Sequence, residues 1–185
     1  MSEAHSPRLR GQAGFTLIEL LIASALGILV MTALTSVVLT TYQANQAATS
    51  RVEASGQIRS FQQTAYDDFA SSTLPAAPGG CGTSTQPCTL DPIQLRGCAL
   101  NSAGRPQQRN VSYAWSTGSG VVDRKVGSAT VNPAASNVTA FAWYLDGQTV
   151  VVSLTVKVRA ISQSQTMRFY PRIVAQAPAY VTLPC

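Results

Sequence analysis

The chain has 185 residues, 45% of them hydrophobic and only 11% charged, whereas about 25% of the residues of an ordinary soluble domain are charged. Its net charge of +5 is mildly basic and lacks the clustered Lys and Arg runs of a nucleic-acid-binding tail. The single histidine, His5, lies in a polar segment before the first apolar run. If that segment is removed, no His-based triad or metal site can form. The composition indicates one modest domain and one long element whose apolar surface is not suited to aqueous solvent.

The apolar residues concentrate near the N-terminus. No charged residue lies between Glu19 and Arg51, and residues 20–39 are apolar apart from a few Ser and Thr. About 20 helical residues span the roughly 30 Å hydrocarbon core of a bilayer, whereas a cleaved secretory signal has an apolar region of only about 7 to 15 residues. Arg8 and Arg10 precede the run. By the positive-inside rule they keep the N-terminus in the cytoplasm, so the chain beyond the apolar run is expected on the far side of the membrane.

Glu19 is the unusual residue of this segment. A carboxylate near the centre of a membrane helix costs about 2.5 to 3.5 kcal/mol, and somewhat less near an end. The apolar segment contains no basic residue to pair with it. A cut between Gly14 and Phe15 would create a positive amine at Phe15, and Glu19 would then be the fifth residue of the mature chain.

The ten residues Gly14 to Ala23, GFTLIELLIA, resemble the type III signal of type IV prepilins and type II secretion pseudopilins. The resemblance implies that residues 1–14 are a leader cut after Gly14 by a membrane prepilin peptidase, usually with methylation of the Phe15 amine. It also implies that Glu19 neutralises the amine of a neighbouring subunit in a filament. The alternative is a single-pass anchor with a stray Glu at its edge.

The helix is expected to continue beyond the apolar segment. Apolar and small residues recur at spacings of three and four from Ala47 through Ile58 and Phe61 to Phe69, which is typical of an amphipathic helix. The sequence 71–80, rich in Ser, Pro and Gly, should end it. The resemblance implies a helix of roughly 55 residues, with a transmembrane and assembly half at 15–42, an amphipathic half at 43–74 and a periplasmic head at 75–185.

The head is expected to be a β-structure behind a long loop. Residues 76–110 are rich in Pro, Gly, Ser and Thr, which predicts a loop. Apolar alternation and the turn signal Asp146-Gly147 then predict a hairpin of strands 137–145 and 149–161. Further strands are expected at 111–116, 125–131 and 165–174, the last an edge strand because of Pro171. The predicted fold class is α+β, type IV pilin-like: the long helix packed on one mainly antiparallel sheet of four or five strands.

The four cysteines all lie beyond the membrane segment, in an oxidising compartment if the orientation holds. We favour disulfides, and of the three pairings we favour Cys81–Cys88, which closes a short loop, and Cys98–Cys185, which fixes the C-terminus. A four-thiolate zinc site is the alternative. It lacks a Cys-x-x-Cys pair, so we expect neither a metal nor a cofactor.

The sequence offers no support for an enzyme. It has no phosphate-binding glycine loop and no base for a nucleophile, and the acid pair Asp67-Asp68 is expected to be solvated. Four basic residues on neighbouring predicted strands could form a patch for DNA or a surface ligand, although the solvated face of a sheet is the more common explanation. They are Lys157, Arg159, Arg168 and Arg172.

Further residues bear on the kind of subunit. Residues 54–61, 66–69 and 79–82 resemble PilW-like minor pilins, and the membrane helix lacks the central Pro that many major pilins carry. We therefore predict a minor pilin of the type IV pilus, incorporated into a filament or initiating it, with other subunits, the peptidase and the inner membrane as partners. The alternatives are a major pilin, a secretion pseudopilin, and a tip subunit that binds DNA or a surface.

Overall fold

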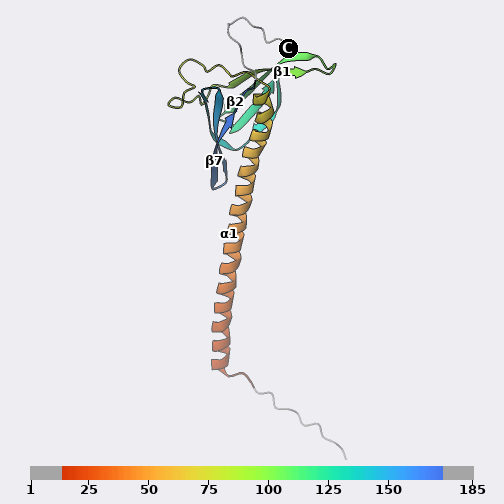
Figure 1. Cartoon of the computed structure of the whole chain (residues 1–185). Coiled ribbons are helices and arrows are strands. Elements are labelled where there is room, and N and C mark those ends of the chain that lie inside the picture. Colours follow the sequence, from red (N-terminus) through yellow and green to blue (C-terminus); the bar gives the residue numbers. More distant parts are fainter. Residues whose placement is uncertain (1–13, 173–185) are drawn as a thin grey trace, which may run out of the picture. The chain divides into compact units, whose positions relative to one another are not determined.

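The computed structural model describes residues 14–172, and the chain divides into two compact units, residues 1–45 and 46–185. One helix, α1 (Leu17–Ala70), contributes to both units (Figure 1). It ends one residue before the predicted stop, where Ser71 and Ser72 begin a turn. The α+β class, with a long N-terminal helix and antiparallel sheets, is confirmed.

In the first unit every described side chain, from Gly14 to Asn45, is exposed. From Ser24 to Thr41, the Ser and Thr hydroxyls donate to carbonyl oxygens three or four residues earlier, as in the contact of Thr35 Oγ1 with the Met31 oxygen at 2.8 Å. Such bonds satisfy hydroxyl groups within the helix, which lets polar residues occupy an apolar environment. By length and composition, α1 is the one described helix able to cross a membrane.

In the second unit the helix buries one stripe against the head. The buried residues follow the spacing of three and four that the sequence indicated, although Ala47 at the start of the predicted stripe is only partly buried. Phe61 joins the helix to both sheets, because its ring lies edge-on to Tyr113 at 5.6 Å and to Phe141 at 6.1 Å between centroids. The buried residues of α1 are Ser50, Ala54, Ile58, Phe61, Ala65, Asp68 and Phe69.

The head contains two antiparallel sheets where one of four or five strands was predicted. The first sheet has the order β1-β2-β3-β4 and the second the order β5-β6-β7. The strands of the first are β1 (Ile93–Leu100), β2 (Pro106–Ser116), β3 (Val121–Val126) and β4 (Ala129–Ala135). Those of the second are β5 (Val138–Asp146), β6 (Thr149–Val158) and β7 (Ile161–Phe169).

Two predictions for the first sheet were wrong. Residues 76–110 are not one loop, because β1 and the first part of β2 lie within them. The expected strand 125–131 is instead the end of β3, a turn at Gly127 and the start of β4. Gly127 has a φ of +62°, which glycine adopts readily and most residues do not.

The second sheet follows the predicted hairpin closely. Asp146 pairs with Thr149 across the turn, and Gly147 has a φ of +61°. Along β6 the residues Val150, Val152, Leu154, Val156 and Val158 are buried, as the alternation predicted. The last strand begins earlier than expected, at Ile161, and β7 lies at the edge of its sheet.

A non-strand segment pairs with one outer strand of each sheet, β1 in the first and β5 in the second. Cys88 exchanges two backbone hydrogen bonds with Trp143 of β5, at 2.8 and 2.9 Å. At the end of α1, Ser72 bridges to Gly97 of β1. A Cβ atom on Gly97 would lie 2.2 Å from the Ser71 carbonyl oxygen, so only glycine permits this approach of helix and sheet.

Candidate functional site

The candidate processing site lies at the start of the described chain, ahead of α1. Phe15 is 81% exposed, and a Cβ placed on Gly14 would meet nothing within 4 Å. The peptide bond between them is therefore open to a protease. Cleavage at Gly14 and methylation of Phe15 remain predictions.

Thr16 caps the helix that follows. Its Oγ1 accepts a hydrogen bond from the Glu19 backbone N–H at 3.3 Å, and its carbonyl oxygen accepts from the N–H groups of Glu19 and Leu20 at 3.1 and 3.2 Å. Thr followed three residues later by Glu is the sequence signature of a capping box. The sequence analysis missed this signal, and it gives Glu19 a second explanation besides pairing with an amine.

The carboxylate of Glu19 is exposed in the first turn of α1. Among residues 14–172, no basic side chain forms an ion pair with it. A carboxylate at the N-terminal end of a helix is favoured by the helix dipole, by about 0.3 to 1 kcal/mol. That gain is smaller than the cost of placing an unpaired charge in a bilayer. Pairing of Glu19 with an amine of another subunit remains a prediction.

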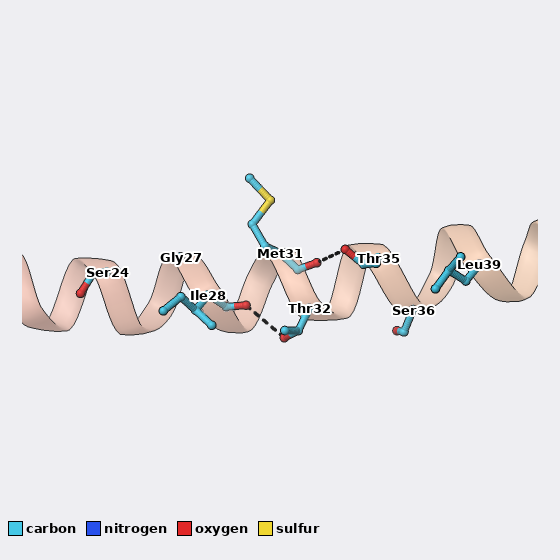
Figure 2. Close-up of a pocket in the computed structure, with 8 residues that line it drawn as sticks. All are labelled: Ser24, Gly27, Ile28, Met31, Thr32, Thr35, Ser36 and Leu39. Atoms are coloured by element: carbon cyan, nitrogen blue, oxygen red, sulfur yellow. Dashed lines mark hydrogen bonds between the residues drawn. The ribbon is translucent and has the colours of Figure 1, made fainter.

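A shallow groove follows one side of the apolar part of α1 (Figure 2). Small and hydroxyl-bearing residues line it at helical spacing, and helices packing in membranes use such residues at close contacts. The Thr32 hydroxyl lies 3.0 Å from the Ile28 carbonyl oxygen, so it needs no further partner. The lining residues are Ser24, Gly27, Ile28, Met31, Thr32, Thr35, Ser36 and Leu39.

The head holds an ionic cluster that the sequence analysis did not foresee. Asp68 is only 3% exposed, so the expectation of a solvated Asp67-Asp68 pair was wrong for this residue. Arg124 donates from Nε to Oδ2 at 2.6 Å and from Nη2 to Oδ1 at 2.9 Å. Arg109 Nη2 lies 3.2 Å from Oδ1, and the Tyr113 hydroxyl donates to Oδ2 at 2.6 Å.

This cluster fixes the helix to the first sheet. Burial, followed by the hydrogen bond to Asp68, raises the pKa of Tyr113, so the phenol stays protonated and acts as a donor. The hydrogen bond to Asp68 raises the pKa of Arg124. Two cations and one hydroxyl satisfy a single carboxylate, an arrangement that positions α1 against the first sheet.

The four basic residues considered as a possible patch do not lie together. Arg168 pairs with Val151 at one end of β6, whereas Lys157 pairs with Ser162 at the other. Arg168 is also neutralised by Asp146, at 3.0 Å. Arg159 lies in the turn after β6, near Lys157, and Arg172 follows β7. The continuous basic surface expected for DNA is therefore not formed by these four residues.

The cysteines of the long loop are joined. The sulfur atoms of Cys81 and Cys88 are 2.02 Å apart and form a disulfide. The group Cys81, Cys88 and Asp91 has the proximity of a metal site, but two sulfur atoms in a disulfide cannot act as thiolate ligands. Cys98 lies on β1. Its predicted partner, Cys185, falls outside the described residues, so that pairing stays a prediction.

The comparisons bear on the N-terminal end. Residues 9–35 match the family model described as the prokaryotic N-terminal methylation motif. Comparison with the curated proteins and with the solved structures gives no match. The matched stretch contains the open Gly14–Phe15 bond, the Thr16 cap, Glu19 and six of the eight residues that line the groove. The chain therefore carries the N-terminal methylation segment by which type IV prepilins and pseudopilins are identified.

Proposed function

We propose that this protein is a minor pilin of the type IV pilus, a structural subunit that enters a filament or initiates one after its leader is removed. A prepilin peptidase would cut between Gly14 and Phe15, and the new Phe15 amine would be methylated. The observation that supports this most directly is the methylation motif at residues 9–35. The residues of that match that the structure describes, 14–35, are all exposed.

The exposed apolar surface of residues 14–45 supports assembly. Its large hydrophobic side chains, from Phe15 to Tyr42, are 56% to 81% exposed. Exposed apolar area costs about 25 cal/mol per Å² in water. This surface therefore requires either a bilayer or other subunits. A pilin has both in turn, the membrane before assembly and neighbouring helices afterwards.

The proposed topology and segments follow from this cycle. Residues 1–14 would be the cytoplasmic leader, residues 15–42 the membrane and assembly half, residues 43–74 the amphipathic half and residues 75–185 the periplasmic head. The disulfide Cys81–Cys88 supports a head in an oxidising compartment. Before assembly, the protein would be a single-pass protein of the inner membrane.

The choice of a minor pilin depends on finer features. Helix α1 is continuous from Leu17 to Ala70 and has no Pro, whereas many major pilins have a Pro within the membrane half. The PilW-like stretches at 54–61 and 66–69 lie on the part of α1 that packs on the head. These features favour a minor subunit over a major pilin or a secretion pseudopilin.

Two measurements test the proposal. N-terminal sequencing of the mature protein should begin at a methylated Phe15. Mass spectrometry of sheared filaments should find the subunit far below the amount of the main subunit, and deletion of its gene should reduce filament number. A subunit that dominates the filament mass would be a major pilin. A deletion that blocks protein secretion and leaves filaments unchanged would show a pseudopilin.

A further inference from the structure

A hollow of about 540 Å³ opens on the head where three connecting regions meet. It is independent of the filament segment, since all of its lining residues belong to the second unit. The turn between β2 and β3, the link between β4 and β5, and the end of β6 each contribute to it. The lining residues are Trp115, Thr117, Gly118, Ser119, Gly120, Asn137, Val138, Thr139, Lys157 and Arg159.

Backbone hydrogen bonds hold these three regions together. The N–H of Val138 donates to the Gly120 carbonyl at 2.8 Å, and the N–H of Lys157 donates to the Asn137 carbonyl at 2.8 Å. Gly120 has a φ of +63° and approaches the Val138 backbone closely. The hollow thus lies between the ends of paired strands and the turn that joins β2 to β3, and backbone hydrogen bonds connect these regions.

Both non-glycine residues with positive φ in the described chain line this hollow. They are Asn137, with a φ of 59°, and Arg159, with a φ of 54°. Asn tolerates the left-handed region, but Arg is strained there, and the turn between β6 and β7 would ordinarily carry Gly at this position. Strained residues that persist in a fold are concentrated at binding and catalytic sites.

The two cations of the hollow are uncompensated. Lys157 and Arg159 are exposed, and neither takes part in an ion pair within residues 14–172. Hydroxyl and amide side chains surround them, supplied by Thr117, Ser119, Asn137 and Thr139. Two free cations among neutral hydrogen-bonding groups form a suitable environment for a negatively charged oxygen group.

Trp115 adds a donor without an acceptor. Its indole Nε1 is the only buried side-chain nitrogen or oxygen atom of the described chain that has no hydrogen-bond partner. A buried donor left unpaired is unfavourable, and native proteins rarely retain one without a reason. Here the unpaired donor belongs to a residue that lines the hollow holding the two unpaired cations.

We propose that this hollow binds a small oxyanionic group, a phosphate or a carboxylate carried on a hydroxyl-bearing ligand. Lys157 and Arg159 supply the charge, and Asn137, Ser119 and the neighbouring hydroxyls bind the neutral part of the ligand. The chain has an arginine at position 159, although glycine would adopt this left-handed backbone conformation with less strain. The hollow contains two unpaired cations, one of them the strained Arg159, and one of its lining residues, Trp115, carries the unpaired indole donor.

The two tryptophans of the chain allow a direct test on the full-length protein in a non-ionic detergent. With ¹⁵N-labelled Trp, the two indole signals are assigned through Trp115→Phe. Inorganic phosphate and glucuronate are then titrated separately, with sodium chloride at matched ionic strength as the reference. The Trp115 signal should move saturably with at least one oxyanion. The Trp143 indole donates to the Asp91 carbonyl at 2.9 Å, so its signal should stay still.

Three variants establish whether binding is specific to the hollow. Arg159→Gly and Lys157→Gln should each weaken binding by roughly tenfold, as expected for one lost charge-assisted hydrogen bond. Lys125→Gln removes the same charge from β3, outside the hollow, and should leave binding unchanged. Arg159→Gly should also raise the melting temperature, because glycine relieves the backbone strain. A merely structural arginine gives no reason for binding and stability to move in opposite directions.

The outcomes separate the sources of the anion and the ways in which the inference fails. Tighter binding of glucuronate would indicate an acidic sugar, and tighter binding of phosphate a phosphorylated ligand. Either result supports the proposal. An equal response to chloride, or equal loss of binding in Lys125→Gln, would mean general charge attraction and would overturn it. So would a Trp115 signal that no titration moves. None of these results depends on whether the subunit enters a filament.

Discussion

The two units of this chain use their apolar residues in opposite ways. From Phe15 to Tyr42 the large hydrophobic side chains are 56% to 81% exposed, whereas those of the head core are 0% to 6% exposed. The head buries its apolar surface within itself, around rings such as Phe61 and Trp143. The described part of the first unit, residues 14–45, has no such interior and must obtain its apolar surroundings from a bilayer or from other subunits. Variants in the first unit should therefore alter processing and assembly, and variants in the second should alter folding.

The largest expected effect is in the first unit. Gly14→Val should block removal of the leader, because the peptidase has to accommodate the residue beside the cleaved bond. Immunoblots should show a precursor about 1.5 kDa heavier, by the rough mass of a leader of this length, retained in the inner membrane. Normal processing of Gly14→Val would contradict the assignment of the leader, and with it the role given to the first unit.

The next effect concerns the head alone. Asp68→Asn would leave Arg124 partly buried without its counter-charge, which should cost about 3 kcal/mol in the free energy of unfolding. Asp67→Asn is the matched control, since Asp67 is exposed, and its cost should stay within about 0.5 kcal/mol. Denaturant unfolding measures both variants. Equal costs would mean that the Asp68 cluster does not fix α1 to the head.

The predicted second disulfide is tested by its loss. Cys185→Ser should expose one new thiol at Cys98 and lower the free energy of unfolding by about 2 to 4 kcal/mol. The readout is thiol labelling of denatured, non-reduced protein taken from the periplasm. Wild type should give no labelled cysteine. A labelled Cys98 in the wild type would remove the Cys98–Cys185 pairing.

A smaller effect is expected where the helix meets β1. Gly97→Ala would bring a methyl group against the Ser71 backbone, so the end of α1 has to shift, at a cost of about 1 to 3 kcal/mol. Gly104→Ala is a useful comparison, because its added Cβ would meet no atom within 4 Å although its φ is +72°. Calorimetry measures the stability that each variant loses. The loss in Gly97→Ala reports the close contact with Ser71, and the loss in Gly104→Ala reports backbone strain alone.

The sequence predicted elements whose signals are local. The apolar run, the amphipathic spacing and Asp146-Gly147 each lie within a few neighbouring residues, and the helix and hairpin formed as expected. Strand β1 was missed because only Ile93 and Leu95 alternate before Gly97, between segments rich in Gly and Pro. The short turn at Arg159 was missed because arginine is not a typical turn residue there, and this turn sets the register that separates Lys157 from Arg168.

The Asp68 cluster shows a different limit. Its position on the helix was readable, since Asp68 lies three residues after Ala65 and seven after Phe61, on the buried face. Its partners were not, because Arg109 and Arg124 lie 41 and 56 residues further along the chain, on strands whose register depends on the whole sheet. The sequence therefore shows a buried charge as an acidic residue at an apolar position of the helix pattern. It does not show the basic residues that pair with it, because tertiary structure brings them together.

Assembly through Glu19 requires that its charge pairs with the Phe15 amine of another subunit, and two variants test that claim. Glu19→Gln preserves the capping-box pattern with Thr16 and removes the charge, whereas Glu19→Val removes both. The measurement is the ratio of subunit in sheared filaments to subunit in the inner membrane. We predict that both variants accumulate in the membrane at least as well as wild type and that both lower the ratio by about tenfold or more, because an unpaired amine in a low-dielectric interface is costly. A Glu19→Gln ratio equal to that of wild type would contradict the claim and leave Glu19 as a helix cap alone.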